Sequence, residues 1–290
     1  MNAAVESRVR PVVLVLASQE APVGTFTVRR ALPARERHSV GPWVFLDHFG
    51  PYRAQPGKDG VGPHPHAGIE TVTYLFSGRN EHRDSAGHAG VVGAGGAQWM
   101  TAGRGVVHAE RPLAESDAER TMHGIQLWTS LPRLLKTTAP RYQRIDAAAI
   151  PRVRRGGATV ALVAGEWEGA RGPAETLMPV FLWHLTLEPG SRFEAEIHRD
   201  FEAGIYVAEG AAALGEAKAA AGELAVWGMA GETLRVDNAG PARLEAMILG
   251  GAPAEGPLVF HGPFVMNSVE QVRAAEIAYR TGRMGSLAPG

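Results

Sequence analysis

Hydrophobic and polar residues alternate along short segments of this chain, which is the pattern of strands with one buried face. The clearest alternation lies at 68–76 and 122–130, and near-continuous apolar runs at 12–16, 40–51 and 159–164 predict buried strands. The 36 glycines and 20 prolines are scattered between these runs, which indicates many tight turns. The pattern predicts an all-β protein.

One segment near the end of the chain departs from this pattern and predicts a short helix. Ser268 and Gln271 have the spacing of a capping box. A modest apolar face follows, formed by Val272, Ala275, Ile277 and Ala278. Gly282 or Gly285 is expected to end the helix.

A short pattern occurs twice in the chain. Thr73–Gly78 is echoed by Ile205–Gly210, with a tyrosine at the same place before the turn, and Trp99–Gly103 is echoed by Trp227–Gly231. Internal repetition of this kind predicts a duplicated barrel.

The predicted domain boundaries follow from this repeat. Residues 1–135 form a first barrel, 136–158 a linker that contains Pro140 and Pro151, and 159–290 a second barrel with the helix. A chain of 290 residues with 45% hydrophobic content has enough apolar mass for two such cores.

Charge and cysteine content narrow the classes of function. The formal net charge is −1 with no long run of Lys or Arg, so we expect no direct binding to nucleic acid or to a membrane surface. The apolar run at 12–16 is too short to span a bilayer. The chain has no cysteine, which excludes thiolate ligands and disulfides and fits a cytoplasmic location.

Two pairs of metal-ligating side chains bracket one glycine-rich stretch: His64-Pro65-His66 and His108-Ala109-Glu110. Side chains two apart on a strand point to the same face, so two neighbouring strands would bring all four together. Three imidazoles and a carboxylate suit a catalytic divalent metal, namely iron, zinc, copper, nickel or manganese.

The residues alone leave part of this site open. Glu70 lies on the strand after His66 with the same parity, and spacing does not decide between Glu70 and Glu110 as the carboxylate ligand. His82 and His88 are interpreted as surface or loop histidines. His48 and His123 are interpreted as core or loop histidines, with a supporting place beside the metal as the alternative.

The repeat also predicts what the second barrel lacks. Counting from the repeated glycines places Glu196 and His198 opposite His64 and His66, and it places Val236 and Asn238 opposite His108 and Glu110. Since at most two of the four ligand positions remain, the second barrel is expected to bind no metal.

At these residues the chain resembles the pirin family of the cupin superfamily. The segments that carry the resemblance are Phe45–His48, His64–His66, Glu70–Leu75, Gln98–Gly105, His108–Glu110 and Gly262–Asn267. The resemblance implies two stacked cupin β-barrels, a bicupin, with one metal in the N-terminal barrel, most simply Fe²⁺. It implies His64, His66, His108 and Glu110 as ligands and leaves Glu70 in the site wall. Many pirins have a basic residue where this chain has Ala67, so a function that needs that charge is in doubt.

The resemblance also implies a function. Members of this family are described as quercetin 2,3-dioxygenases or as iron-dependent transcription co-regulators. We expect a dioxygenase that takes a flavonol-like aromatic molecule and O₂, with Glu110 as the general base for the 3-hydroxyl. The alternative is a redox-sensing regulatory protein that binds a protein partner without turnover. A third hypothesis is a structural metal in a barrel that binds another small molecule.

Overall fold

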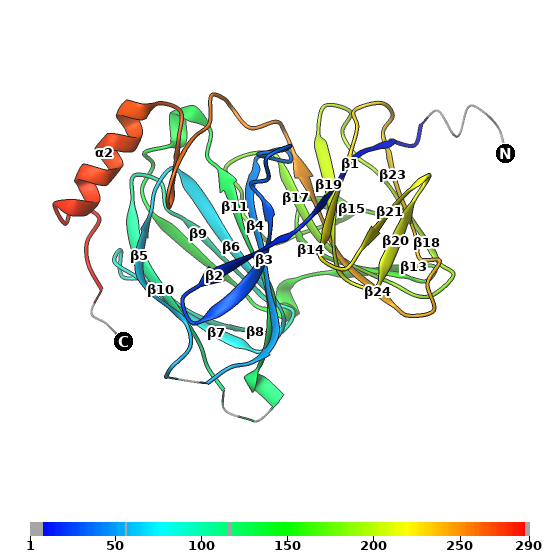
Figure 1. Ribbon diagram of the computed structural model, residues 1–290, viewed down its shortest axis with the longest axis horizontal. Helices are drawn as coiled ribbons and strands as arrows, with labels where there is room; N and C mark the ends of the chain where they lie inside the picture. The colour runs from blue at the N-terminus through cyan, green and yellow to red at the C-terminus, as the bar shows by residue number, and fades with distance from the viewer. Residues whose placement is uncertain (1–7, 56, 115, 117, 288–290) are drawn as a thin grey trace. The chain divides into compact units, whose positions relative to one another are not determined.

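The computed structural model describes residues 8–55, 57–114, 116 and 118–287 (Figure 1). Strands make up most of these residues, and the described part of the chain has one α-helix, α2 (Val269–Arg280). No described helix is long and apolar enough to cross a membrane. The all-β prediction with a short C-terminal helix is confirmed.

The described residues divide into two compact units. One, here called the histidine unit, comprises Glu20–Arg30, Val44–Ala149 and the described part of the chain from Ala254 onward. The other, here called the apolar unit, comprises the described residues up to Gln19 together with Ala31–Trp43 and Ile150–Pro253.

The histidine unit contains a seven-stranded and a four-stranded sheet. The seven-stranded sheet has the order β12-β9-β6-β11-β4-β3-β2, and the four-stranded sheet has the order β5-β10-β7-β8. The bounds are β2 Gln19–Val23, β3 Phe26–Leu32, β4 Trp43–Arg53, β5 Val61–His66, β6 Ile69–Ser77, β7 Arg79–Asp84, β8 Ala89–Gly93, β9 Ala97–Thr101, β10 Val106–Pro112, β11 Thr121–Ser130 and β12 Arg141–Ile145. Three short 3₁₀ turns, η1 Ala118–Arg120, η2 Arg133–Leu135 and η3 Ala147–Ala149, lie in the connections.

The apolar unit repeats this arrangement. Its seven-stranded sheet has the order β1-β22-β19-β24-β17-β14-β13, and its four-stranded sheet has the order β18-β23-β20-β21. The bounds are β1 Val12–Ala17, β13 Arg152–Arg155, β14 Ala158–Ala164, β17 Val180–Leu187, β18 Arg192–Glu196, β19 Glu202–Glu209, β20 Ala211–Leu214, β21 Ala217–Ala220, β22 Glu223–Trp227, β23 Thr233–Asp237 and β24 Leu244–Gly251. A small ribbon, β15 (Glu166–Trp167) and β16 (Ala170–Arg171), completes it. The two matching strand orders confirm the predicted duplication.

Residue burial follows the strand period in both units. On β18, Phe193 and Ala195 are buried while their neighbours are exposed, and on β23 Leu234 and Val236 are buried. These residues join a large apolar core inside the apolar unit.

The division into units differs from the predicted boundaries. β1 pairs with β22 and so belongs to the apolar unit, although it is the first strand of the chain. The helix α2 packs in the histidine unit, where Val272 and Ala275 meet Phe264 and Met266. The predicted linker 136–158 contains β12, which pairs with β9, and β13, which pairs with β14. The prediction assigned each segment to the same unit as its neighbours in the chain. Pairing of β1, β12 and β13 at sheet edges, and packing of the helix, instead decide the unit to which each belongs.

The count that placed Glu196 and His198 opposite His64 and His66 was wrong by three residues, whereas Val236 lies in the place of His108 as predicted. Residues 67–68 join β5 to β6, whereas residues 197–201 join β18 to β19. Because the second connection is three residues longer, Phe193 and Ala195 take the places of His64 and His66. Glu196 instead forms an exposed ion pair with Arg8.

Candidate metal centre

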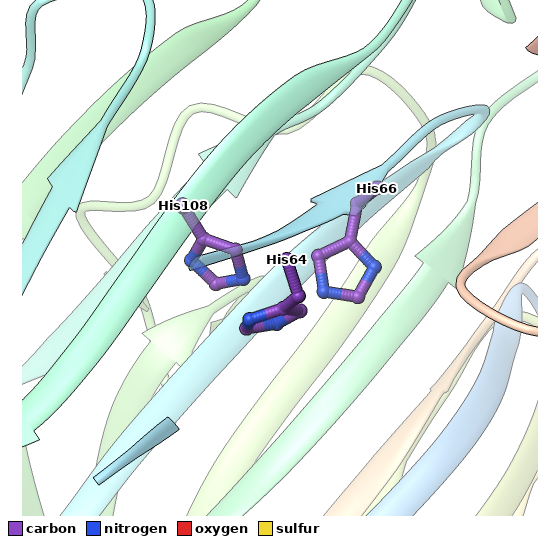
Figure 2. Close-up of side chains that lie close together, drawn as sticks. All are labelled: His64, His66 and His108. Carbon is purple, nitrogen blue, oxygen red and sulfur yellow. The ribbon is translucent and has the colours of Figure 1, made fainter. Parts of the chain in front are cut away.

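His64, His66 and His108 meet on neighbouring strands of the histidine unit. β5 and β10 run antiparallel, with His64 opposite His108. The candidate ligand atoms of the three rings all lie within 4.8 Å of one another, and the rings face a common point (Figure 2). The ring centroids are 4.9 Å apart for His64 and His66, 4.3 Å for His64 and His108, and 5.0 Å for His66 and His108. The predicted convergence of these three residues therefore occurs.

The outer nitrogens of these rings have partners that orient them. Nδ1 of His64 lies 2.8 Å from the carbonyl oxygen of Gly62, and Nδ1 of His66 lies 3.2 Å from that of Pro263. A carbonyl only accepts, so each Nδ1 carries the hydrogen and each Nε2 keeps its lone pair. This is the tautomer that a metal ligand needs.

Nε2 of His108 supplies a test of whether the cluster fits a metal. This atom is buried and has no hydrogen-bond partner among the described residues. A buried polar atom without a partner costs free energy, and a metal held by the three rings would remove that cost. The donor set, which contains only nitrogen and oxygen, also suits a first-row divalent ion. The residues therefore fit a bound metal.

Burial keeps the rings in the form that binds a metal. It lowers the pKa of His66 to about 3, with a further lowering by His64. Burial also lowers the pKa of His108 well below its usual value, and the neighbouring histidines act in the same direction. Both rings are thus neutral near pH 7, and their lone pairs are available without loss of a proton.

Glu110 lies on the same strand as His108 but outside the cluster of three. A register shift separates the two residues on β10. Oε1 of Glu110 is 3.0 Å from the Thr73 hydroxyl and accepts a 3.2 Å bond from Nδ2 of Asn80. Both partners are buried in the same unit. The structure thus brings three of the four predicted ligands together and leaves the fourth outside the cluster, in contact with Thr73 and Asn80.

Glu70 lies on the opposite face of β6 from Thr73. It is buried and accepts bonds from the hydroxyls of Thr101 at 2.7 Å and Thr129 at 3.4 Å. Burial raises the pKa of Glu70, and these hydroxyls act in the opposite direction. Glu70 is not in the wall of the metal centre, because strand alternation points it away from the histidines.

Four further histidines of the histidine unit form two groups. His48 and His123 are buried and face each other, with their Nε2 atoms 2.7 Å apart. His82 was interpreted as a surface or loop residue, and this is wrong: it is buried, and its Nδ1 lies 3.4 Å from Nδ1 of His108. His88 is partly exposed and contacts Asp84. The spacing His82-x-Asp84 is the same i,i+2 pattern as His64-x-His66, and it could have identified His82 and Asp84 as candidate site residues.

Aromatic side chains adjoin the cluster. The partly exposed ring of Trp128 lies 4.9 Å from that of His66 and stacks on Phe45 at 4.0 Å and 10°. The Arg30 guanidinium lies 4.6 Å over the Phe45 ring and forms bonds of 2.8 and 2.7 Å with Asp47. We call Trp128, Phe45 and Arg30 the aromatic wall.

Ala67 is fully buried in this chain. It packs with Phe264, Met266 and Val272 in a small apolar cluster. A charged side chain has no place in that cluster without a paired partner. This position therefore contributes no charged surface.

Strand order and site together define a class of protein: a duplicated cupin-type β protein with a candidate three-histidine metal centre in one unit. Comparison with known proteins agrees. The sequence matches the family description "Pirin" over residues 25–129 and "Pirin C-terminal cupin domain" over residues 182–285. This chain belongs to the pirin family.

Relatives and solved structures cover nearly the whole chain. A pirin-like protein of Caulobacter vibrioides is 37% identical over 279 residues, which is 95% of this chain and 99% of that protein. A pirin-like protein of Arabidopsis thaliana is 37% identical over 252 residues, covering 84% of this chain and 80% of that protein. The structure of quercetin 2,3-dioxygenase from Acinetobacter baumannii has a TM-score of 0.89 at 29% identity, covering 97% of this chain and 100% of that one.

Proposed function

We propose that this protein is a metal-dependent dioxygenase that opens the ring of a flavonol-like substrate with O₂. The observation that carries the proposal is the cluster of three histidines, with the unpartnered, buried Nε2 of His108. The similarity to a quercetin 2,3-dioxygenase over the full chain supports the choice of reaction.

His64, His66 and His108 would hold the metal, and Glu110 would complete the ligand set. Three or four protein ligands leave coordination positions for substrate and O₂ on an ion that accepts five or six ligands. When bound, Fe²⁺ or a related divalent ion would supply Lewis acidity toward the 3-hydroxyl of the flavonol and redox chemistry with O₂.

Glu110 is the residue that we assign to proton transfer. Both of its hydrogen bonds reach Oε1, and Oε2 receives none from the residues that the structure describes. Thr73 and Asn80 would thus fix the carboxylate while Oε2 accepts the proton of the 3-hydroxyl. Loss of that proton gives the electron-rich enolate on which O₂ adds before the ring opens with loss of carbon monoxide.

The aromatic wall supports a planar aromatic substrate. Trp128 is partly exposed next to His66, so a flat ring bound at the metal can stack against it.

The first prediction concerns Glu110→Gln. The amide keeps the shape and the contacts of the side chain but cannot act as a base, so kcat for oxygen uptake with quercetin should fall about 10²- to 10⁴-fold. Oxygen consumption under saturating substrate measures it, and Glu81→Gln, on the opposite face of β7 from Asn80, where Glu81 pairs with Arg111, is the control. Full activity of Glu110→Gln would remove Glu110 from the proposal. A wild-type protein that binds metal but consumes no oxygen would favour the regulatory alternative.

A further inference from the structure

The outer side of His108 meets a buried chain of polar groups that the proposed reaction does not use. Nδ1 of His108 lies 3.4 Å from Nδ1 of His82, and Nε2 of His82 lies 3.3 Å from Oδ2 of Asp84. The side chains of His82 and Asp84 are 2% and 0% exposed. β7 and β10 are paired so that His108 is directly opposite Asp84, which places the chain across two neighbouring strands.

The positions of the hydrogens in this chain are restricted. A metal at His108 needs the lone pair of Nε2, so Nδ1 must carry the hydrogen and donate it to Nδ1 of His82. His82 then carries its own hydrogen on Nε2 and donates it to Asp84. This assignment gives each contact one donor and one acceptor and leaves Nε2 of His108 open.

Asp84 is anchored by donors on its other side. Its carboxylate accepts bonds from the backbone nitrogens of Ala86 at 2.9 Å and His88 at 3.0 Å, and from the His88 ring at 2.9 Å. Burial raises the pKa of Asp84, but the bonds from His82 and His88 lower it, and the net direction is downward. Asp84 is therefore a buried carboxylate that remains ionised.

The ring plane of His82 is fixed as well. The Tyr142 ring stacks on it at 4.4 Å and 10°. A buried imidazole that is held by stacking on its face and by bonds at both nitrogens cannot rotate freely. Because His82 is fixed, its hydrogen bond with Nδ1 of His108 also holds the His108 ring in one orientation.

We propose that His82 and Asp84 are positioning residues of the metal centre, which hold His108 in its ligating tautomer, raise the basicity of Nε2 and offset the charge of a bound dication. The proposal rests on the proposed function, since it takes the three histidines to be metal ligands. The buried Asp84 carboxylate places a negative charge behind His108, which offsets part of the positive charge of a divalent ion bound there. Carboxylates that act through a histidine affect metal affinity in this way.

The experiment measures the affinity of metal-free protein for Co²⁺ near neutral pH, from the visible absorption of bound cobalt in competition with a chelator. Asp84→Asn removes the charge with little change in shape. His82→Phe keeps the stacking on Tyr142 but removes the acceptor, and His82→Gln offers an amide oxygen in its place. His48→Gln, which alters a buried histidine pair elsewhere in the same unit, is the matched control.

Asp84→Asn and His82→Phe are expected to weaken Co²⁺ binding by about 10- to 100-fold, and His82→Gln by less than His82→Phe. His48→Gln should bind as the wild type does. Asp84→Asn alone carries the test if His82→Phe does not fold. Wild-type affinity in a folded Asp84→Asn protein would overturn the proposal. Absence of Co²⁺ binding by the wild type would overturn the metal centre itself and the positioning role with it.

Discussion

The contacts of each ring nitrogen decide what each histidine of this protein can do. His64 and His66 use Nδ1 on backbone carbonyls, which leaves Nε2 for the cluster. His48 and His123 use their Nε2 atoms on each other. A nitrogen that is engaged with another ring is not available to a metal, so these four histidines have separate roles although they share a chemistry.

The buried His48–His123 pair predicts that the free energy of unfolding falls in acid. Burial lowers the pKa of His48 to about 3, with smaller contributions from Arg29 and His123, against a usual value of 6.5. Between about pH 3 and pH 6.5 the unfolded chain binds a proton at His48 that the folded chain does not, so the free energy of unfolding falls as the pH falls.

Replacing His48 by Gln removes that proton. Chemical denaturation at several pH values between 4 and 6.5 should give a shallower loss of stability for His48→Gln, by up to about 1.4 kcal/mol per pH unit. His38→Gln, on a partly exposed loop of the other unit, serves as the comparison. Equal slopes for His48→Gln and wild type would mean that His48 binds its proton in the folded protein too.

Trp128 carries a prediction about the substrate. Trp128→Leu removes the aromatic face beside His66, so KM for quercetin should rise about tenfold while kcat changes less. Trp128→Phe retains a stacking surface and should stay closer to wild type. Steady-state oxygen uptake over a range of substrate concentrations separates the two constants. An unchanged KM for Trp128→Leu would place the substrate elsewhere.

Local sequence pattern predicted the residues of the cluster but not their surroundings. His64-x-His66 and His108-x-Glu110 are visible because strand parity alone puts each pair on one face. His82 sits in a polar segment, and only the pairing of β7 with β10 brings it to His108. Strand order is a non-local property, so the spacing His82-x-Asp84 could mark two polar residues on one strand face but not their place beside His108.

At the scale of elements, a C-terminal hairpin supports the first strand of the metal centre. β25 (Val259–His261) and β26 (Phe264–Met266) pair with each other, and Pro263 in their turn accepts the bond from His66. Lys136 ties the same region together, because its buried Nζ donates to the carbonyls of Gly68 and Val265 and to the Ser130 hydroxyl, each at 2.8 Å.

Lys136→Met should therefore destabilise the histidine unit. The substitution leaves buried oxygen acceptors without a donor, which costs on the order of 3 kcal/mol in the free energy of unfolding. Lys218→Met, at an exposed position on β21, should change it by less than about 0.5 kcal/mol. Urea denaturation of both variants gives the comparison. A Lys136→Met protein as stable as wild type would show that water or a shifted backbone satisfies these oxygens.

The repeated elements were predictable, whereas their detailed register was not. Tyr74 and Tyr206 lie on corresponding strands, β6 and β19, and both are fully buried. The count back to the second ligand positions failed because the connection before β19 is longer. The alternation of strand residues does not reveal the length of the loop between two strands. A residue count that crosses a loop is therefore wrong by the difference in loop length.

At the scale of the whole molecule, one strand order supports two different interiors. β1 takes the edge position in the apolar unit that β12 takes in the histidine unit. Where the histidine unit has His64, His66 and His108, the apolar unit has Phe193, Ala195 and Val236. The fold therefore does not determine the chemistry, which depends on a few side chains directed into one barrel.

The metal content of the purified protein tests the central claim most directly. Protein purified without added metal, analysed by plasma mass spectrometry, is expected to hold about one first-row divalent ion per chain. His108→Ala should hold almost none, while His198→Ala, which alters an exposed histidine of the apolar unit, should match wild type. Equal metal content in His108→Ala and wild type, or wild type that remains free of metal after incubation with Fe²⁺, would contradict a metal centre at His64, His66 and His108.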